Sequence, residues 1–121
     1  MKIIDLVTEK LAENTELKNF RKGTTKIISA NETNIVYQRG KSRFYLKTRD
    51  FDDTYTKYAG TTCSTSDLKK YNTKVFGKDG HSCNATLFFQ ILKFLDLAEI
   101  NGDGVRNNPY YGFIKKIDFN G

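Results

Sequence analysis

The sequence predicts an α+β fold, because the spacing of its apolar residues changes twice along the chain. Apolar residues have helical spacing near the N-terminus, alternate with polar residues between positions 24 and 47, and then return to helical spacing. A chain of 121 residues with 38% apolar residues is long enough to form one domain with its own core. We therefore expect a single domain over residues 1–121. Its first part, 1–48, would hold an N-terminal helix and a three-stranded antiparallel meander. Residues 49–121 would hold further helices and a C-terminal β-hairpin, with a long flexible tip and a last strand from Tyr110 to Phe119.

Residues Lys2 to about Ala12 have the pattern of an amphipathic helix, with an apolar face made of Ile3, Ile4, Val7 and Leu11. Leu17 and Phe20 resume the spacing after a break, so the helix either continues to Phe20 or restarts before Gly23, its expected stop. The segment is interrupted by acidic residues and has no small-residue cleavage site, which is unlike a signal peptide. We expect a cytoplasmic protein.

Three segments rich in β-branched and aromatic residues predict the meander, namely Thr24 to Ile28, Asn34 to Gln38 and Ser42 to Lys47. Short polar breaks separate them, as in a series of hairpins. Alternation places Phe44 and Leu46 on one face of the sheet and Arg43, Tyr45 and Lys47 on the other.

The positive charge is concentrated in one part of the sequence. Lys18 to Arg49 contains nine basic residues and one acidic residue, a net charge of +8, so the rest of the +6 chain carries −2. Such a segment produces a positive field that attracts polyanions, although a solvated basic face that serves solubility is the alternative. We expect phosphate contacts from Arg39, Lys41, Arg43 and Lys47.

Two short helices and one longer helix are expected after the meander. Asp50 to Tyr58 has acidic residues in its first turn, with Asp50 as N-cap, and Ser64 to Asp67 has the pattern that starts a second helix through Tyr71. A polar loop, Lys74 to His81, then leads to a helix that begins at Ser82 or Asn84 and reaches Leu97.

The third of these helices is apolar around most of its circumference, so it belongs in a core. It is too short to span a bilayer, and we expect no membrane association. Cys83, Thr86, Gln90 and Lys93 fall on one stripe that we expect to escape burial. Two interpretations remain. The stripe is the wet edge of a core helix, or the helix reads DNA bases through Asn84, Thr86, Gln90 and Lys93.

The phrase LFFQILKFLDLAEINGDG runs from this helix into a short strand and a glycine-rich tip. With it, Asp50 to Ile117 resembles a winged helix-turn-helix DNA-binding domain: a helix, a second short helix, a longer helix and a two-stranded wing. In that family the longer helix lies in the major groove and the wing touches the flanking backbone or minor groove. The resemblance implies base reading by Asn84, Thr86, Gln90 and Lys93, and wing contacts by Arg106, Asn107 and Asn108.

The sequence does not favour catalysis or metal binding. His81 is the sole histidine, and with Cys63 and Cys83 it cannot complete a four-ligand zinc site without carboxylates. A phosphate-binding loop ending in lysine and serine is absent. We expect no catalytic residues, no metal, no cofactor and two reduced cysteines.

The leading hypothesis is a non-enzymatic domain that binds double-stranded DNA, with the basic sheet face and hairpin on phosphates and the central helix and C-terminal wing on bases. A small phage or defence-system inhibitor that binds a protein partner is one alternative. An RNA-binding module that uses exposed aromatic side chains is another.

Overall fold

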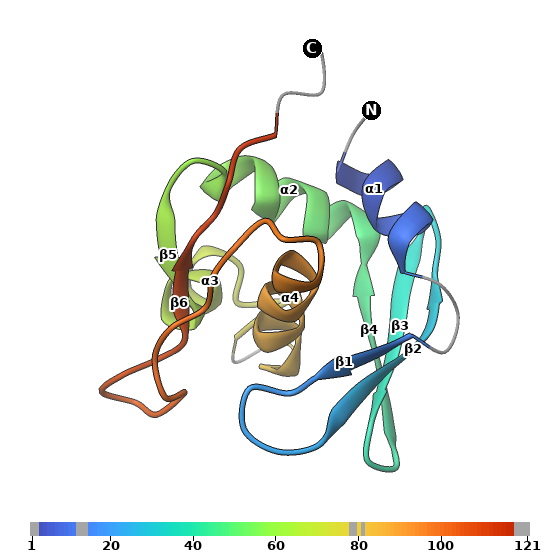
Figure 1. Cartoon of the computed structure of the whole chain (residues 1–121), viewed down its shortest axis with the longest axis horizontal. Coiled ribbons are helices and arrows are strands. Elements are labelled where there is room, and N and C mark those ends of the chain that lie inside the picture. The colour runs from blue at the N-terminus through green and yellow to red at the C-terminus, as the bar shows by residue number, and fades with distance from the viewer. Residues whose placement is uncertain (1–2, 12–14, 78–79, 81, 118–121) are drawn as a thin grey trace. The chain divides into compact units, whose positions relative to one another are not determined.

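The computed structural model describes residues 3–11, 15–77, 80 and 82–117. Its helices and antiparallel strands confirm the α+β class (Figure 1). The chain forms two compact units. The described part of unit 1 ends at Asp53 and unit 2 comprises Thr54–Ile117, so the boundary falls inside helix α2 (Thr48–Tyr58).

Unit 1 contains a helix and an antiparallel sheet. Helix α1 (Ile3–Lys10) buries Ile3 and Val7, as its amphipathic pattern predicts. The sheet has the order β1-β2-β3-β4, with β1 at Glu16–Lys18, β2 at Thr24–Ala30, β3 at Asn34–Arg39 and β4 at Ser42–Lys47. The three predicted strands are confirmed as β2, β3 and β4, and β1 makes the sheet four-stranded.

Strand β1 corrects the expectation that a helix continues or restarts before Gly23. Leu17 is buried, and its neighbours in the strand are exposed, which is the pattern of a strand with one packed face. The turn after β1 is closed by Asn19, whose backbone N–H donates to the carbonyl oxygen of Gly23 at 3.0 Å. Gly23 has φ of +83°, a conformation that suits glycine, so it belongs to the connection between β1 and β2 and does not stop a helix.

Helix α2 begins directly after β4. The backbone N–H of Thr48 donates to the carbonyl oxygen of Thr33 at 3.1 Å, and its hydroxyl donates to that of Asn31 at 2.7 Å. These bonds start the helix two residues before Asp50, which lies in the first turn and is not the N-cap. The acidic side chain still suits the positive end of the helix dipole.

Unit 2 contains two further helices and a small sheet. Helix α3 (Thr65–Tyr71) begins with the predicted capping box, in which Ser64 and Asp67 exchange side-chain and backbone hydrogen bonds. Strand β5 (Thr62–Ser64) pairs with β6 (Tyr111–Phe113), which is shorter than the predicted strand from Tyr110 to Phe119. Isolated bridges join Ala98 to Ile114 and Asn101 to Tyr111, so residues 98–114 form the predicted hairpin. Residues 118 and 119 lie outside the described part.

Helix α4 (Cys83–Phe94) supplies the largest group of buried apolar side chains in unit 2. The ring of Phe88 lies 6.2 Å from that of Phe76 and 5.7 Å from that of Phe89. Its N-cap is Ser82, although the Ser82 side chain makes no capping hydrogen bond. The helix ends before Leu97, because Asp96 has φ of +59° and the backbone N–H of Leu97 turns back to the carbonyl oxygen of Leu92 at 2.7 Å.

Candidate nucleic-acid interface

The sheet of unit 1 has one packed face and one solvent-exposed face. The packed face carries Leu17, Ile27, Ile35, Tyr37 and Leu46, which are all buried. We call the opposite face, defined by Glu16, Lys18, Lys26, Asn34, Val36, Gln38, Arg43, Tyr45 and Lys47, the open face. The strand register runs one row of it across all four strands, from Glu16 through Lys26 and Gln38 to Arg43. The predicted alternation along β4 is therefore confirmed.

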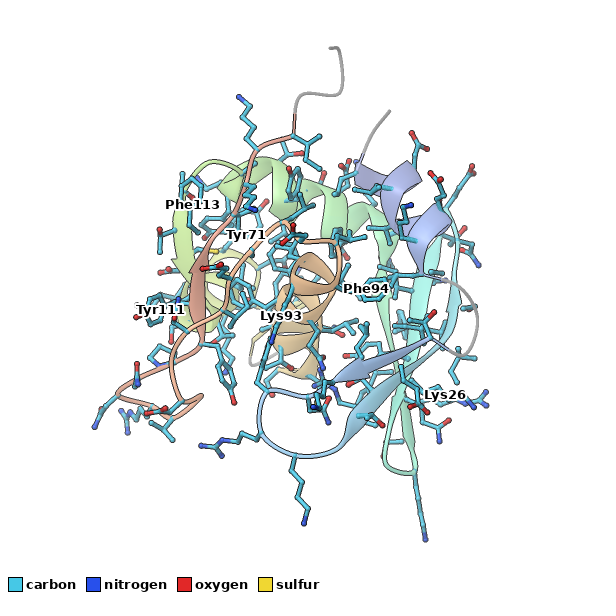
Figure 2. The ribbon with its side chains drawn as sticks, viewed as in Figure 1. Lys26, Tyr71, Lys93, Phe94, Tyr111 and Phe113 are labelled. Atoms are coloured by element: carbon cyan, nitrogen blue, oxygen red, sulfur yellow. The ribbon has the colours of Figure 1, made fainter. Side chains whose placement is uncertain are left out.

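Two turns bring positive charge to one end of this sheet. The β1–β2 connection and the β3–β4 turn lie at the same end, because β1 and β3 both run towards it and β2 and β4 run away from it (Figure 1). We call the exposed cations gathered there the basic end, and Figure 2 shows one of them, Lys26, projecting outward from β2. The basic end consists of Lys18, Arg21, Lys22, Lys26, Lys41 and Arg43.

The four residues predicted to contact phosphates differ in where the structure places them. Lys41 and Arg43 belong to the basic end, and Lys47 is exposed on the open face but at the opposite end of β4, where it pairs with Asn34. Arg43 also donates from Nε to Oε1 of Gln38 at 3.4 Å, which orients its guanidinium along the row.

Arg39 is half-buried and does not lie on the open face, and its expected phosphate contact stays a prediction. Its Nε donates to the hydroxyl of Thr25 at 2.8 Å, and its guanidinium carbon lies 5.5 Å from the centre of the Tyr37 ring. The Thr25 hydroxyl in turn donates to Oδ1 of Asn19 at 2.6 Å. This chain of hydrogen bonds joins the two turns that carry the basic end, and Arg39 itself is half-buried.

Helix α4 does not expose the polar stripe that the sequence predicts. Asn84 and Gln90 are only 4% and 3% exposed, which is too little for either amide to reach a base edge. Nδ2 of Asn84 donates to the carbonyl oxygen of Val75 at 3.0 Å, and the hydroxyl of half-buried Thr86 donates to the carbonyl oxygen of Cys83. Of the predicted stripe, Lys93 alone is exposed. The expected exposure of the stripe is therefore wrong at Gln90, and Asn84, which base reading would also require to be exposed, is buried as well.

The tip of the C-terminal hairpin is held by hydrogen bonds, although its glycines and asparagines predict flexibility. Nδ2 of Asn108 donates to Oδ2 of Asp103 at 2.9 Å, and the backbone N–H groups of Asp103 and Gly104 both donate to the carbonyl oxygen of Asn108. Asn108 therefore has a structural role. Arg106 and Asn107 occupy the exposed turn between Val105 and Asn108, where both side chains can meet a ligand.

Exposed aromatic side chains are a second feature of the surface, and the leading DNA-binding hypothesis gives them no role. Tyr45 on β4 is 58% exposed and Phe113 on β6 is 53% exposed, with Tyr111 on the same side of β6 (Figure 2). Lys93 and Phe94 leave the end of α4 in different directions (Figure 2). Alternation along β4 predicts Tyr45 as outward-facing between Arg43 and Lys47, and the register adds Val36 as its cross-strand partner.

Two buried groups of unit 2, Cys63 and Tyr55, have raised pKa values. Burial, with a smaller effect from Asp67, raises the pKa of the Cys63 thiol to about 12. Burial also raises the pKa of Tyr55, whose hydroxyl donates to the carbonyl oxygen of Lys115 and accepts from the N–H of Ile117. The two Tyr55 hydrogen bonds fasten the C-terminal segment. Because both pKa values are raised, neither group is poised for proton transfer near neutral pH.

Within residues 3–11, 15–77, 80 and 82–117, no three histidine, cysteine or acidic side chains gather as a metal site. No helix in the same residues is long and apolar enough to cross a membrane. His81 lies outside them, so its expected lack of a catalytic partnership with Cys83 stays a prediction. No protein-family model, curated protein or solved structure matches the chain.

Proposed function

We propose that this chain is a non-enzymatic DNA-binding domain that attaches to phosphates through the basic end of its four-stranded sheet. The observation that supports the proposal is the convergence of six exposed cations from two turns and three strands. Glu16 is the one acidic residue on the open face as defined above. A surface with one sign of charge attracts a polyanion and releases its counterions on binding.

The C-terminal half supports a winged-helix assignment as part of the same proposal. The order of α2, α3, α4 and the hairpin over residues 98–114 is the order on which the sequence resemblance rests. In this assignment the hairpin is the wing, and Arg106 and Asn107 at its tip contact the DNA backbone or minor groove. Base reading is not assigned to Asn84 or Gln90, because both amides are buried. Thr86 and Lys93 remain candidates on α4.

A salt titration tests the proposal. Binding of a mixed-sequence fluorescent duplex is measured by anisotropy over a series of salt concentrations. If all six cations of the basic end neutralise phosphates, the slope of log affinity against log salt should be about −5. A slope near zero, or no binding at low salt, would overturn the proposal and favour a protein partner for the basic end.

A further inference from the structure

The aromatic ring of Tyr45 stands on the open face of the sheet with solvent over it. Tyr45 lies on β4, which is an edge strand, and its cross-strand partner on β3 is half-buried Val36. The side chain is 58% exposed, the largest value among the exposed large hydrophobic side chains of the described residues. A flat ring on a rigid strand, open on one side, can accept another flat ring by stacking.

The neighbours of Tyr45 on the same face suit a nucleotide. Arg43 and Lys47 lie two residues before and after it, so their Cα atoms are each about 7 Å away along the strand. Both side chains are exposed and positive. Gln38 and Asn34 on β3 pair with Arg43 and Lys47, so half-buried amides flank the ring diagonally. A base on the Tyr45 ring would therefore have a cation on each side for its phosphates and an amide near its edge.

The packed face supports this position from behind. The ring of Tyr37 on β3 stacks on that of Phe44 on β4, with centroids 5.5 Å apart. Because Phe44 directly precedes Tyr45, this contact fixes the strand from which the Tyr45 ring projects.

We propose that Tyr45 is a base-stacking platform and that the preferred ligand of the open face is a single strand of nucleic acid, with phosphates held by Arg43 and Lys47. The inference rests on the proposed nucleic-acid binding and specifies its ligand. In a duplex each base is already stacked and paired, so the Tyr45 ring would have no exposed base to contact. A single strand offers bases to any aromatic platform, with little dependence on sequence.

The test compares Tyr45→Ala and Tyr45→Phe with the parent on a single-stranded oligothymidylate, an oligouridylate and a duplex of equal length. Tyr45→Ala should weaken binding of a single strand about 5- to 150-fold, because stacking of one base is lost. Tyr45→Phe keeps the ring and should retain most of the affinity. Tyr71→Ala, which removes an exposed tyrosine from α3, is the matched control and should bind like the parent. The two oligonucleotides distinguish DNA from RNA as the source of the strand.

The outcomes separate the two proposals. If the protein binds duplex with a steep salt slope and Tyr45→Ala binds single strands like the parent, the stacking inference is wrong and the DNA-binding proposal survives. An equal loss on duplex and single strand also contradicts the inference, because stacking on an unpaired base cannot explain it. If none of the three ligands binds at low salt, both proposals fail, and the open face has a partner of another class.

Discussion

The side-chain amide of Asn84 donates a 3.0 Å hydrogen bond to the backbone carbonyl oxygen of Val75, which ties the first turn of α4 to the segment after α3. In sequence, Asn84 is an equally good candidate for reading an adenine edge. The distinction depends on a carbonyl group nine residues earlier in the chain. Asn84 therefore links the start of α4 to the segment after α3, and its burial removes it from the binding surface.

Replacement of Asn84 by alanine should therefore destabilise the fold. The Val75 carbonyl would lose its buried partner, and we expect the free energy of unfolding to fall by about 1 to 3 kcal/mol. Urea denaturation measures the effect. Ser82→Ala is the control and should change stability by less than about 0.5 kcal/mol, because the exposed Ser82 side chain makes no capping hydrogen bond. Unchanged stability together with altered base preference in Asn84→Ala would restore the base-reading role.

The two cysteines should differ in reactivity. Cys63 is buried and its pKa is raised to about 12, whereas Cys83 is half-buried. Because the thiolate is the reactive form, a disulfide reagent at pH 8 should modify Cys83 first in the native protein and Cys63 only after unfolding. Cys83→Ala should thus remove the fast phase, and Cys63→Ala should leave it. A fast phase that persists in Cys83→Ala would show that Cys63 is accessible.

Stability should decrease at alkaline pH for the same reason. The folded state raises the pKa of Cys63 from 9.0 to about 12, so it holds the thiol proton more tightly than the unfolded chain does. The resulting stabilisation is fully present below pH 9 and is lost as pH rises towards 12. Burial of Tyr55, with an ordinary value of 10.0, acts in the same direction. Urea midpoints of the parent should therefore fall more steeply above pH 9 than those of Cys63→Ala.

Asp96 offers a site for stabilisation. It adopts φ of +59°, and the bonds from its own N–H and that of Leu97 close the end of α4. A side chain in this left-handed conformation is strained, and glycine is not, so Asp96→Gly should raise the free energy of unfolding by about 0.5 to 1 kcal/mol. The same substitution at exposed Asp53 in the interior of α2 should lower it by a similar amount. A loss of stability in Asp96→Gly would mean that the aspartate side chain contributes more than the strain costs.

Much of the fold follows from local patterns in the sequence. Alternation along 42–47 predicts β4 and its outward residues, and Ser64 with Asp67 predicts the start of α3, because capping and pleating involve neighbours in the chain. The sequence does not predict strand β1, because three residues are too few to show an alternating pattern. Its pairing with β2 determines its conformation. No local pattern distinguishes a strand of this length from the end of a helix.

The candidate site is less predictable, because exposure depends on distant partners. Arg39 and Arg43 lie on either side of one hairpin turn and look equivalent in sequence. In the structure Arg39 binds Thr25 from the adjacent strand and is half-buried, whereas Arg43 is exposed. The helical spacing predicts that Gln90 lies on a solvent-exposed edge of α4, but its side chain is buried. Charge density in the sequence identifies the right segment, and the register selects the side chains within it.

The salt dependence of two charge-matched variants tests the DNA-binding proposal most directly. One variant removes three cations of the basic end, with Arg21, Lys22 and Lys41 changed to Gln, and the other removes three exposed cations of unit 2, with Lys57, Lys115 and Lys116 changed to Gln. Each lowers the formal net charge from +6 to +3. Phosphate contact at the basic end predicts that the slope of log affinity against log salt becomes shallower by about 2.7 in the first variant and stays near the parent value in the second. Equal slopes for the two variants would contradict it, because the net charge of the protein would then govern binding and the basic end would not.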